Sequence, residues 1–244
     1  MIEYIYENLK EILMLLKGLQ KLTLLDFPGK MAATVFAGGC NFRCPFCHNA
    51  SLVIGNRLNE TPSLTEDEFF AFLERRRGLL EGVCVSGGEP TLYRDLIPFL
   101  EKIKNLGYLV KLDTNGYRPD ALKAAVKAGV VDYVAMDIKN SKESYAKTVG
   151  IPNFDISKIS ESVDFLMSGA VDFEFRTTLV KQLHTERDIY SIATWLRGEE
   201  KYFLQSFLDS GDLISDKLDG FDKKETELLL NVIKVHVKNA QIRG

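Results

Sequence analysis

The sequence predicts an α/β fold, a partial barrel of parallel strands and helices, and three observations lead to it. Short apolar runs rich in β-branched residues alternate with longer helical patterns along the 244-residue chain. Several of these runs lack polar alternation, as strands buried on both faces do. Unusual polar residues follow nearly every run, at the point where the predicted strand ends.

Six segments are predicted to be strands, beginning with 32–37, which reads Ala-Ala-Thr-Val-Phe-Ala. The other strand candidates are 82–86, 109–114, 133–137, 173–179 and 202–207. Helical stretches lie between them near 65–77, 94–106, 119–128, 157–168 and 186–197, and a last helix is predicted near 223–239. Because successive parallel strands need a crossover connection, this alternation predicts six βα units in one parallel sheet.

The helix near 65–77 has the clearest start signal. Thr65 and Glu68 have the spacing of a capping box, and Phe69 and Leu73 follow with helical periodicity. At the N-terminus, acidic residues precede the apolar segment 12–16 and no small-residue cleavage site follows it. This segment therefore predicts part of an amphipathic helix rather than a signal peptide.

The position of the polar motifs distinguishes a barrel from an open sheet. An open sheet gathers its site at one switch point, whereas a βα barrel builds its site from the carboxyl ends of most strands. The motifs at the strand ends are 40–47, 86–90, 113–116, 137–139, 176–178 and Gln205. We therefore predict a partial (β/α)6 TIM-like barrel domain over residues 18–244, with an added N-terminal helical extension over residues 1–17.

The composition is that of a globular protein, with 45% hydrophobic and 27% charged residues. The net charge of −3 gives no general attraction to nucleic acid or to anionic membranes. No apolar run approaches the roughly 18 residues that a membrane-spanning helix needs. We expect a cytoplasmic protein with neither nucleic acid nor a membrane as its partner.

Three of the four cysteines, Cys40, Cys44 and Cys47, lie within eight residues in a C-x3-C-x2-C pattern. A closed zinc site and an ordinary electron-carrying 4Fe–4S cluster each take four protein ligands. Three ligands leave one iron of a 4Fe–4S cluster open to a small molecule, which indicates an enzyme. A zinc knuckle with His48 as fourth ligand and a set of buried free cysteines are the alternatives.

The segment Gly87-Gly88-Glu89-Pro90 follows the second predicted strand. Its two glycines would let the backbone approach a ligand closely, and the carboxylate of Glu89 would suit an amino group, which needs acceptors for its protons. The alternative is a plain turn between strand and helix, because Gly-Gly and Glu-Pro are common in turns.

Charged groups end the later strands. Asp113 and Thr114 could hold a ligand hydroxyl or a cation, although the following Asn-Gly is also a common turn. Asp137 and Lys139 are two residues apart and so point to the same side, where they form either a pair at the barrel mouth or a simple surface ion pair. Arg176 lies among apolar neighbours and must face a ligand carboxylate or an internal acid.

Together these motifs resemble the radical S-adenosylmethionine (SAM) superfamily over about residues 18–207. Cys40, Cys44 and Cys47 match its cluster motif, and the Gly-Gly-Glu-Pro segment matches the motif for the SAM amino group. The resemblance implies a partial βα barrel and a 4Fe–4S cluster whose open iron is chelated by SAM. It further implies that an electron from the cluster cleaves SAM to methionine and a 5′-deoxyadenosyl radical.

The stretch from Asp-Phe-Pro-Gly at 26–29 to Cys-His-Asn at 47–49 is similar to the glycyl-radical-enzyme activases, in particular those of anaerobic ribonucleoside-triphosphate reductase. The resemblance implies a monovalent cation near SAM and these SAM-contacting residues: Phe46, His48, Gly87, Gly88, Glu89, Asp113, Thr114, Asp137, Lys139 and Arg176. Gln205 stands where the formate-lyase branch places a SAM-contacting histidine. The absence of a further cysteine group excludes the activases with inserted ferredoxin-like clusters.

The leading hypothesis is an activase that generates a glycyl radical on anaerobic ribonucleotide reductase, with flavodoxin or ferredoxin as electron donor. Activation of pyruvate formate-lyase or of another glycyl-radical enzyme is an alternative. A small-molecule radical SAM enzyme such as 7-carboxy-7-deazaguanine synthase is another. A non-catalytic iron–sulfur or zinc protein belongs to a different class, and a fourth cysteine near the loop would favour it, but Cys84 lies on a different element.

Overall fold

A computed structural model describes residues 13–198 and 201–243 of the chain. Its centre is one eight-stranded sheet whose strands lie side by side in chain order. The strands are β1 (Leu16–Thr23), β2 (Ala32–Ala37), β3 (Gly82–Gly87), β4 (Leu109–Thr114), β5 (Tyr133–Asp137), β6 (Asp172–Leu179), β7 (Tyr202–Ser206) and β8 (Gln241–Arg243).

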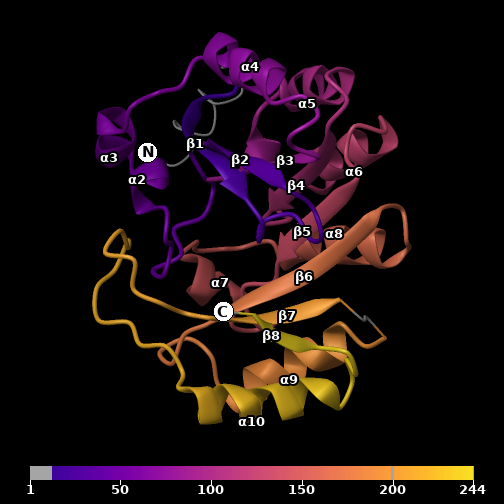
Figure 1. Ribbon diagram of the computed structural model, residues 1–244. Coiled ribbons are helices and arrows are strands. Elements are labelled where there is room, and N and C mark those ends of the chain that lie inside the picture. The colour runs from indigo at the N-terminus through magenta and orange to yellow at the C-terminus, as the bar shows by residue number, and fades with distance from the viewer. Residues whose placement is uncertain (1–12, 199–200, 244) are drawn as a thin grey trace.

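The sheet forms a partial barrel. Strand β1 pairs antiparallel with β2, and every later neighbour pair is parallel. Strands β1 and β8 lie at the two ends of the strand order, so the barrel stays open between them. In Figure 1 the sheet curves from β1 to β8 and the long helices lie along its outer side. The predicted α/β partial barrel is confirmed.

Helices connect the strands. They are α2 (Ala50–Val53), α3 (Gly55–Glu60), α4 (Glu66–Arg75), α5 (Leu96–Asn105), α6 (Pro119–Lys127), α7 (Tyr145–Val149), α8 (Ile156–Met167), α9 (Glu186–Trp195) and α10 (Lys223–Lys234), with a 3₁₀ turn η1 (Pro90–Leu92). The capping box predicted before α4 is present, because the Thr65 hydroxyl accepts from the Glu68 amide and the Glu68 carboxylate accepts from the Thr65 amide.

Two parts of the prediction need correction. Seven parallel strands are present in the described ranges instead of the predicted six, because the short β8 follows α10 and pairs with β7. Of the helix predicted over 1–17, residues 1–12 lie outside the described ranges. Residues 13–17 are not helical. Leu16 begins strand β1, which pairs with β2.

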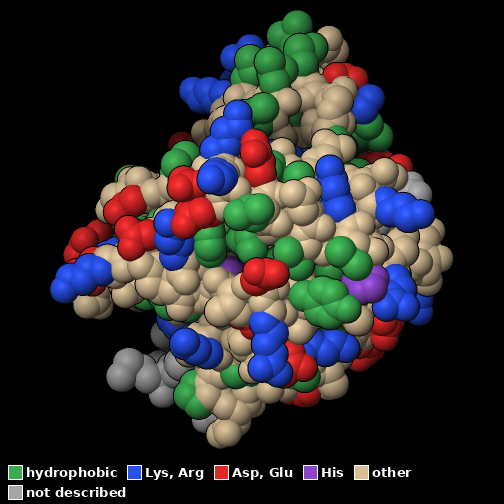
Figure 2. Space-filling view, turned by 90° about the horizontal axis from the view of Figure 1, so that it is seen from below, with side chains coloured by type: hydrophobic (Ala, Val, Ile, Leu, Met, Phe, Trp, Pro, Cys, Tyr) green, Lys and Arg blue, Asp and Glu red, His purple; other side chains and the backbone are tan. Residues whose placement is uncertain are grey.

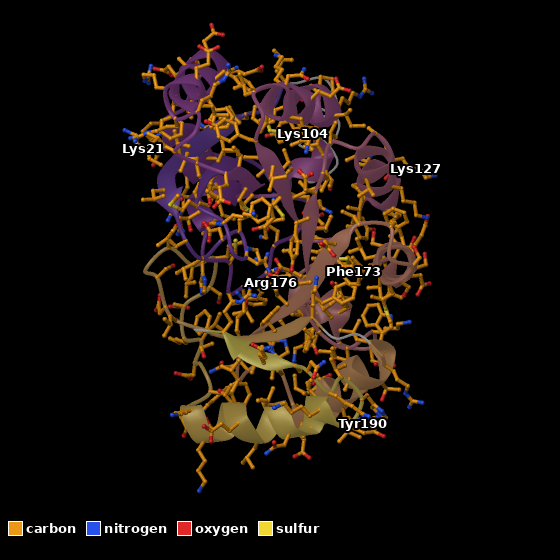
Figure 3. All side chains as sticks on the ribbon, turned by 45° about the vertical axis from the view of Figure 1, so that its right-hand side comes forward. Lys21, Lys104, Lys127, Phe173, Arg176 and Tyr190 are labelled. Atoms are coloured by element: carbon orange, nitrogen blue, oxygen red, sulfur yellow. The ribbon has the colours of Figure 1, made fainter. Side chains whose placement is uncertain are left out.

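The two faces of the sheet differ in chemistry. Alternate residues such as Val83, Leu112 and Phe175 are fully buried in the core cluster shared with the helices. The residues between them on the same strands, including Lys111 and Arg176, point to the opposite face, since side chains alternate along a strand. The inside of the barrel is therefore polar and charged. Figure 3 shows Arg176 near the middle of the molecule.

The outer surface has mixed charges. On the face seen in Figure 2, Lys and Arg side chains are interspersed with Asp and Glu, and hydrophobic side chains form small groups between them. Among the described residues, no helix combines the length and the apolar character that crossing a membrane requires.

Candidate active site

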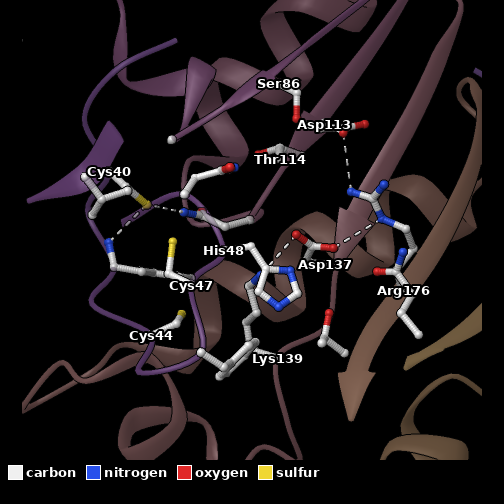
Figure 4. A pocket seen from close by; sticks show the side chains of 18 residues that line it. Cys40, Cys44, Cys47, His48, Ser86, Asp113, Thr114, Asp137, Lys139 and Arg176 are labelled. Atoms are coloured by element: carbon white, nitrogen blue, oxygen red, sulfur yellow. Dashed lines mark hydrogen bonds and ion pairs between the residues drawn. The ribbon is translucent and has the colours of Figure 1, made fainter. Parts of the chain in front are cut away.

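A cavity of about 230 Å³ lies at the carboxyl ends of the barrel strands. Figure 4 shows side chains from the cysteine loop and from the strand ends converging on it. Its lining is Cys40, Phe42, Cys44, Phe46, Cys47, His48, Asn49, Val53, Ser86, Gly88, Asp113, Thr114, Asn115, Asp137, Lys139, Arg176, Thr178 and Gln205. Of the site residues predicted from the sequence, Gly87 and Glu89 do not line the cavity.

The cysteine loop connects β2 to α2 and places its three thiols on this cavity. Cys44 is buried, and Cys40 and Cys47 are half-buried. Burial raises the pKa of all three thiols, that of Cys44 to about 12. A metal ligand must be a thiolate. These groups are therefore neutral thiols at neutral pH until a metal displaces their protons.

Amide groups surround the sulfur of Cys40. The backbone amide of Phe42 donates to Cys40 Sγ at 3.3 Å, and Asn115 Nδ2 donates to it at 3.8 Å. Asn115 Nδ2 also donates to Asn41 Oδ1 at 2.8 Å. Asn41 Nδ2 is buried without a hydrogen-bond partner. An unpartnered donor beside a metal-binding loop is ready to bond an acceptor that arrives with the metal.

The loop is held in shape by its neighbours. Arg43 Nη1 donates to the carbonyl oxygens of Cys40 and Phe42, at 2.7 Å each. The ring of His48 stacks on Phe207 at 5.3 Å between centroids. Burial lowers the pKa of His48, so the imidazole is neutral near pH 7.

A segment that follows β7, residues 207–215, crosses over this loop and is here called the strap. The Asp212 carboxylate accepts from the amide of Ser51 at 3.0 Å and from its hydroxyl at 2.7 Å. The Ser215 amide donates to the Pro45 carbonyl at 2.9 Å. The Asp212 carbonyl accepts from the Ala50 amide at 3.3 Å. The strap therefore fixes the start of α2, immediately after the last of the three cysteines.

The two glycines at the end of β3 allow close packing against the cysteine loop. The Gly88 amide donates to the Ala37 carbonyl at 2.8 Å. A Cβ at Gly88 would lie 1.9 Å from the Gly39 carbonyl oxygen, and one at Gly87 would lie 2.4 Å from that of Ala37. Gly87 also has φ +112°, which disfavours any side chain. Hence only glycine fits at either position.

Glu89 is fully buried and does not line the cavity. Its carboxylate accepts from the amide and hydroxyl of Thr91, from the Thr114 hydroxyl at 2.7 Å and from the Asn115 amide at 2.6 Å. Burial raises its pKa, although these hydrogen bonds act in the opposite direction. Glu89 thus positions the turn that carries Thr114 and Asn115. The carboxylate is bonded to these protein groups, and its contact with a ligand amino group stays a prediction.

A network of ion pairs covers the opposite wall. Arg176 Nε lies 3.2 Å from Asp137 Oδ1, and Arg176 Nη2 lies 3.5 Å from Asp113 Oδ2. Lys139 Nζ lies 3.0 Å from Asp137 Oδ2, so the predicted pair is present and faces the barrel mouth. Figure 4 shows this network across the cavity from the cysteines. Arg176 therefore pairs with internal acids, one of the two alternatives left open by the sequence.

The zinc alternative needs His48 as a fourth ligand beside the three cysteines. Among the described residues, no group of three or more His, Cys, Asp or Glu side chains is arranged to hold a single metal ion. His48, the expected fourth zinc ligand, stacks on Phe207.

Comparison with known proteins decides the family. Residues 34–196 match the sequence model of the radical SAM superfamily, which spans the cysteine loop and strands β3 to β6. The chain belongs to the radical SAM superfamily. It is therefore an enzyme, and membership implies a 4Fe–4S cluster and SAM.

Two relatives of known sequence differ in how much of the chain they match. A Methanocaldococcus jannaschii protein provisionally named a glycyl-radical enzyme activating enzyme is 32% identical over 235 residues, 94% of this chain and 95% of that protein. The 7-carboxy-7-deazaguanine synthase of Koribacter versatilis is 32% identical over 156 residues, 63% of each chain.

Solved structures support the fold. QueE from Escherichia coli superposes with a TM-score of 0.56 at 14% identity, covering 99% of this chain and 96% of QueE. SuiB of Streptococcus suis, solved with its precursor peptide SuiA, superposes with a TM-score of 0.64 at 14% identity, covering 84% of this chain and 47% of SuiB.

The described residues fit the cofactors of the radical SAM superfamily. Three thiols line the cavity, and Asn41 of the same loop has a buried amide nitrogen without a hydrogen-bond partner. When bound there, the cluster supplies the electron that cleaves SAM. The residues of this chain exclude water, fix the loop and offer polar contacts at the strand ends.

Several lining residues were not assigned to the site from the sequence: Phe42, Asn49, Val53, Ser86, Asn115 and Thr178. Ser86 and Asn115 belong to the quoted motifs, so their position at strand ends was a sufficient signal. Val53 lies on the short α2, for which the sequence predicted no element, and carries no chemical signal of its own.

Proposed function

We propose that this radical SAM enzyme is an activase that generates a glycyl radical on anaerobic ribonucleoside-triphosphate reductase. The match to the Methanocaldococcus jannaschii protein carries the activase part, because it extends over nearly the full length of both chains. The choice of the reductase rests on the sequence resemblance around the cysteine loop. Flavodoxin or ferredoxin as electron donor and a cytoplasmic location are expectations of the same proposal.

The shape of the barrel supports a large substrate. The strand order leaves β1 and β8 unpaired with each other, so the barrel is open between these two strands. A loop of a partner protein needs such an opening to bring a backbone Cα to the strand ends.

We assign the following roles to the residues of the cavity. Cys40, Cys44 and Cys47 hold the cluster, and the backbone at Gly87 and Gly88 approaches the amino end of SAM. Phe46 and His48 flank SAM, and Arg176 lines the same cavity while its guanidinium pairs with Asp113 and Asp137. Asp113, Thr114, Asp137, Lys139 and Gln205 supply polar contacts to the rest of the ligand. Glu89 acts through the Thr114–Asn115 turn that it holds.

Electron paramagnetic resonance tests the proposal. The reconstituted, reduced protein would be mixed anaerobically with SAM and the reductase from the same source. A glycyl-radical doublet is expected, and it should vanish in Cys44→Ala but persist in Cys84→Ala, since Cys84 is buried away from the cavity. SAM cleavage without a doublet on the reductase or on any other glycyl-radical enzyme would overturn the activase assignment.

A small-molecule enzyme is the second candidate. The 7-carboxy-7-deazaguanine synthase of Koribacter versatilis has the same identity, although over a shorter stretch of both chains. Turnover of a pterin-like substrate by the reduced protein, with no radical on any protein partner, would favour it.

A further inference from the structure

Lys111 is a buried charge beneath the cavity. It lies on β4 two residues before Asp113, so both side chains point into the barrel. In register it faces Cys84 of β3, and its own side chain is 1% exposed. A buried ammonium is costly unless it is paired and hydrogen-bonded, so its partners show what it does there.

The ammonium forms an ion pair with Asp113 Oδ1 and lies 3.8 Å from Cys84 Sγ. The other oxygen of Asp113 accepts from the Ser86 hydroxyl at 2.9 Å and faces Arg176 at 3.5 Å. Both oxygens of this carboxylate are therefore already neutralised by cationic side chains.

The neighbouring side-chain oxygens have partners as well. Asp137 Oδ1 pairs with Arg176 and Asp137 Oδ2 with Lys139. The Thr114 hydroxyl donates to Glu89 and accepts from the Gly116 amide at 3.1 Å. Asp113 and Thr114 are the residues that the sequence suggested for a cation, and the family resemblance implied a monovalent cation near SAM. A hard cation needs oxygen ligands that are free to coordinate it, and the side-chain oxygens of this set have other partners.

The charges point the same way. Three cationic groups, Lys111, Lys139 and Arg176, face two carboxylates, Asp113 and Asp137. With Glu89 counted as ionised, the positive and negative charges are equal. No net negative charge is left to attract another cation. This matters because the charges are buried, where solvent and salt screen their interactions only weakly.

We propose that the ammonium of Lys111 takes the place of a bound monovalent cation in this site, so that SAM binding by this chain requires neither K⁺ nor Na⁺. The proposal rests on SAM binding in the cavity and does not depend on which partner is activated. Its motivating observation is the complete pairing of the Asp113 and Asp137 oxygens.

The first experiment is a SAM-binding titration of the reconstituted wild-type protein. The dissociation constant would be measured at equal ionic strength in KCl, NaCl and tetramethylammonium chloride. We expect the three values to agree within about twofold, because the required positive charge is covalently part of the chain. A dissociation constant more than about tenfold higher in tetramethylammonium chloride would overturn the proposal.

Substitutions at Lys111 test the role directly. Lys111→Met keeps the length of the side chain and removes the charge, which leaves one Asp113 oxygen without its partner. SAM affinity should fall about tenfold or more in tetramethylammonium chloride, a loss of about 1.4 kcal/mol or more, and K⁺ should restore it. Lys111→Arg keeps the charge and should stay independent of K⁺.

Lys104→Met is the matched control. Lys104 pairs with Asp132 and lies at the periphery of the molecule, away from Arg176 (Figure 3). The SAM dissociation constant of Lys104→Met should be the same in KCl, NaCl and tetramethylammonium chloride. A Lys111→Met protein that folds, binds its cluster and gains no response to K⁺ would contradict the proposal.

A second readout needs neither SAM nor a partner enzyme. Tl⁺, an analogue of K⁺, can be followed by its own NMR signal. Lys111→Met should bind it and wild type should not. Tight Tl⁺ binding by wild type would contradict the proposal while leaving the activase assignment untouched. Should Lys111→Met fail to fold, the wild-type titrations alone decide the question.

Discussion

At the scale of single residues, the four cysteines divide by their surroundings. Cys40, Cys44 and Cys47 line the cavity, whereas Cys84 lies on β3 beneath it, next to the ammonium of Lys111. Burial raises the pKa of Cys84 well above that of a free thiol, which keeps it protonated. Cys84 is thus a buried small side chain, as the sequence indicated.

This division predicts the metal content of two variants. Cys44→Ala should lose nearly all bound iron after anaerobic reconstitution, because two thiolates do not hold a 4Fe–4S cluster. Cys84→Ala should retain the wild-type iron content of about four per chain. Iron and sulfide analysis checks both. Full iron loading of Cys44→Ala would show that the cluster is held elsewhere.

Asn115 is expected to tune the cluster. Its amide donates toward Cys40 Sγ, and donors to the sulfur ligands stabilise the more negative, reduced cluster. Asn115→Leu should therefore lower the reduction potential, measured by a potentiometric titration of the reduced-cluster signal. Asn49→Leu is the control, because that amide donates to the Gly87 carbonyl instead. An unchanged potential in Asn115→Leu would remove Asn115 from this role.

The sequence predicted most of the site residues because their types are rare at the ends of buried strands. Glu89 and Lys111 show where this reasoning stops. The sequence does not indicate that the Glu89 carboxylate bonds to the Thr114–Asn115 turn. Its orientation depends on the Thr114 hydroxyl, a donor 25 residues away in the chain. Lys111 did carry a signal, as a lysine within an apolar strand two residues before Asp113.

At the scale of elements, the strap makes the cysteine loop depend on a segment more than 150 residues away in the chain. Asp212 accepts from both the amide and the hydroxyl of Ser51, so Asp212→Ala leaves the first turn of α2 without its acceptor. We expect faster loss of the cluster in air and a decrease in unfolding free energy of about 1–2 kcal/mol. Absorbance decay and denaturant unfolding measure the two effects.

Asp216→Ala is the matched control for the strap, because Asp216 is an exposed aspartate that directly follows the strap in the chain. It should behave as wild type in both measurements. Equal rates of cluster loss in wild type, Asp212→Ala and Asp216→Ala would mean that the strap does not protect the cluster.

The strands that were predicted correctly are those with a regular hydrophobic pattern in the sequence. The six predicted strands appear as β2 to β7, because each is an apolar run bounded by turn residues. Strand β1 was not foreseen, since its exposed residues 20–22 and its antiparallel pairing give no buried-strand pattern. Strand β8 has three residues, too few to show any periodicity.

At the scale of the whole molecule, a barrel with charges inside should respond to acid. Burial favours the neutral form of Asp113, but Arg176 and Lys111 outweigh it and lower the pKa to about 2. In the unfolded chain this carboxyl takes up its proton near pH 4. Between these values the unfolded state binds more protons, so stability falls as pH decreases from about 4 to 2.

Asp113→Asn tests that dependence. The variant should be less stable than wild type at pH 6, because two cationic groups lose a partner, and the difference should shrink as the pH falls towards 2. Denaturant unfolding at several pH values measures it, with Asp216→Asn as an exposed control. A stability difference that stays constant over this range would contradict the assignment of an ionised Asp113.

The most direct test of the central claim follows a hydrogen atom. Anaerobic ribonucleotide reductase labelled with α-deuterated glycine would be treated with the reduced protein and SAM, and the 5′-deoxyadenosine formed would be analysed by mass spectrometry. An activase must transfer deuterium from the reductase into this product, in proportion to the glycyl radical counted by paramagnetic resonance. Product without deuterium, at any extent of SAM cleavage, would contradict the proposal that a backbone glycine of that enzyme is the substrate.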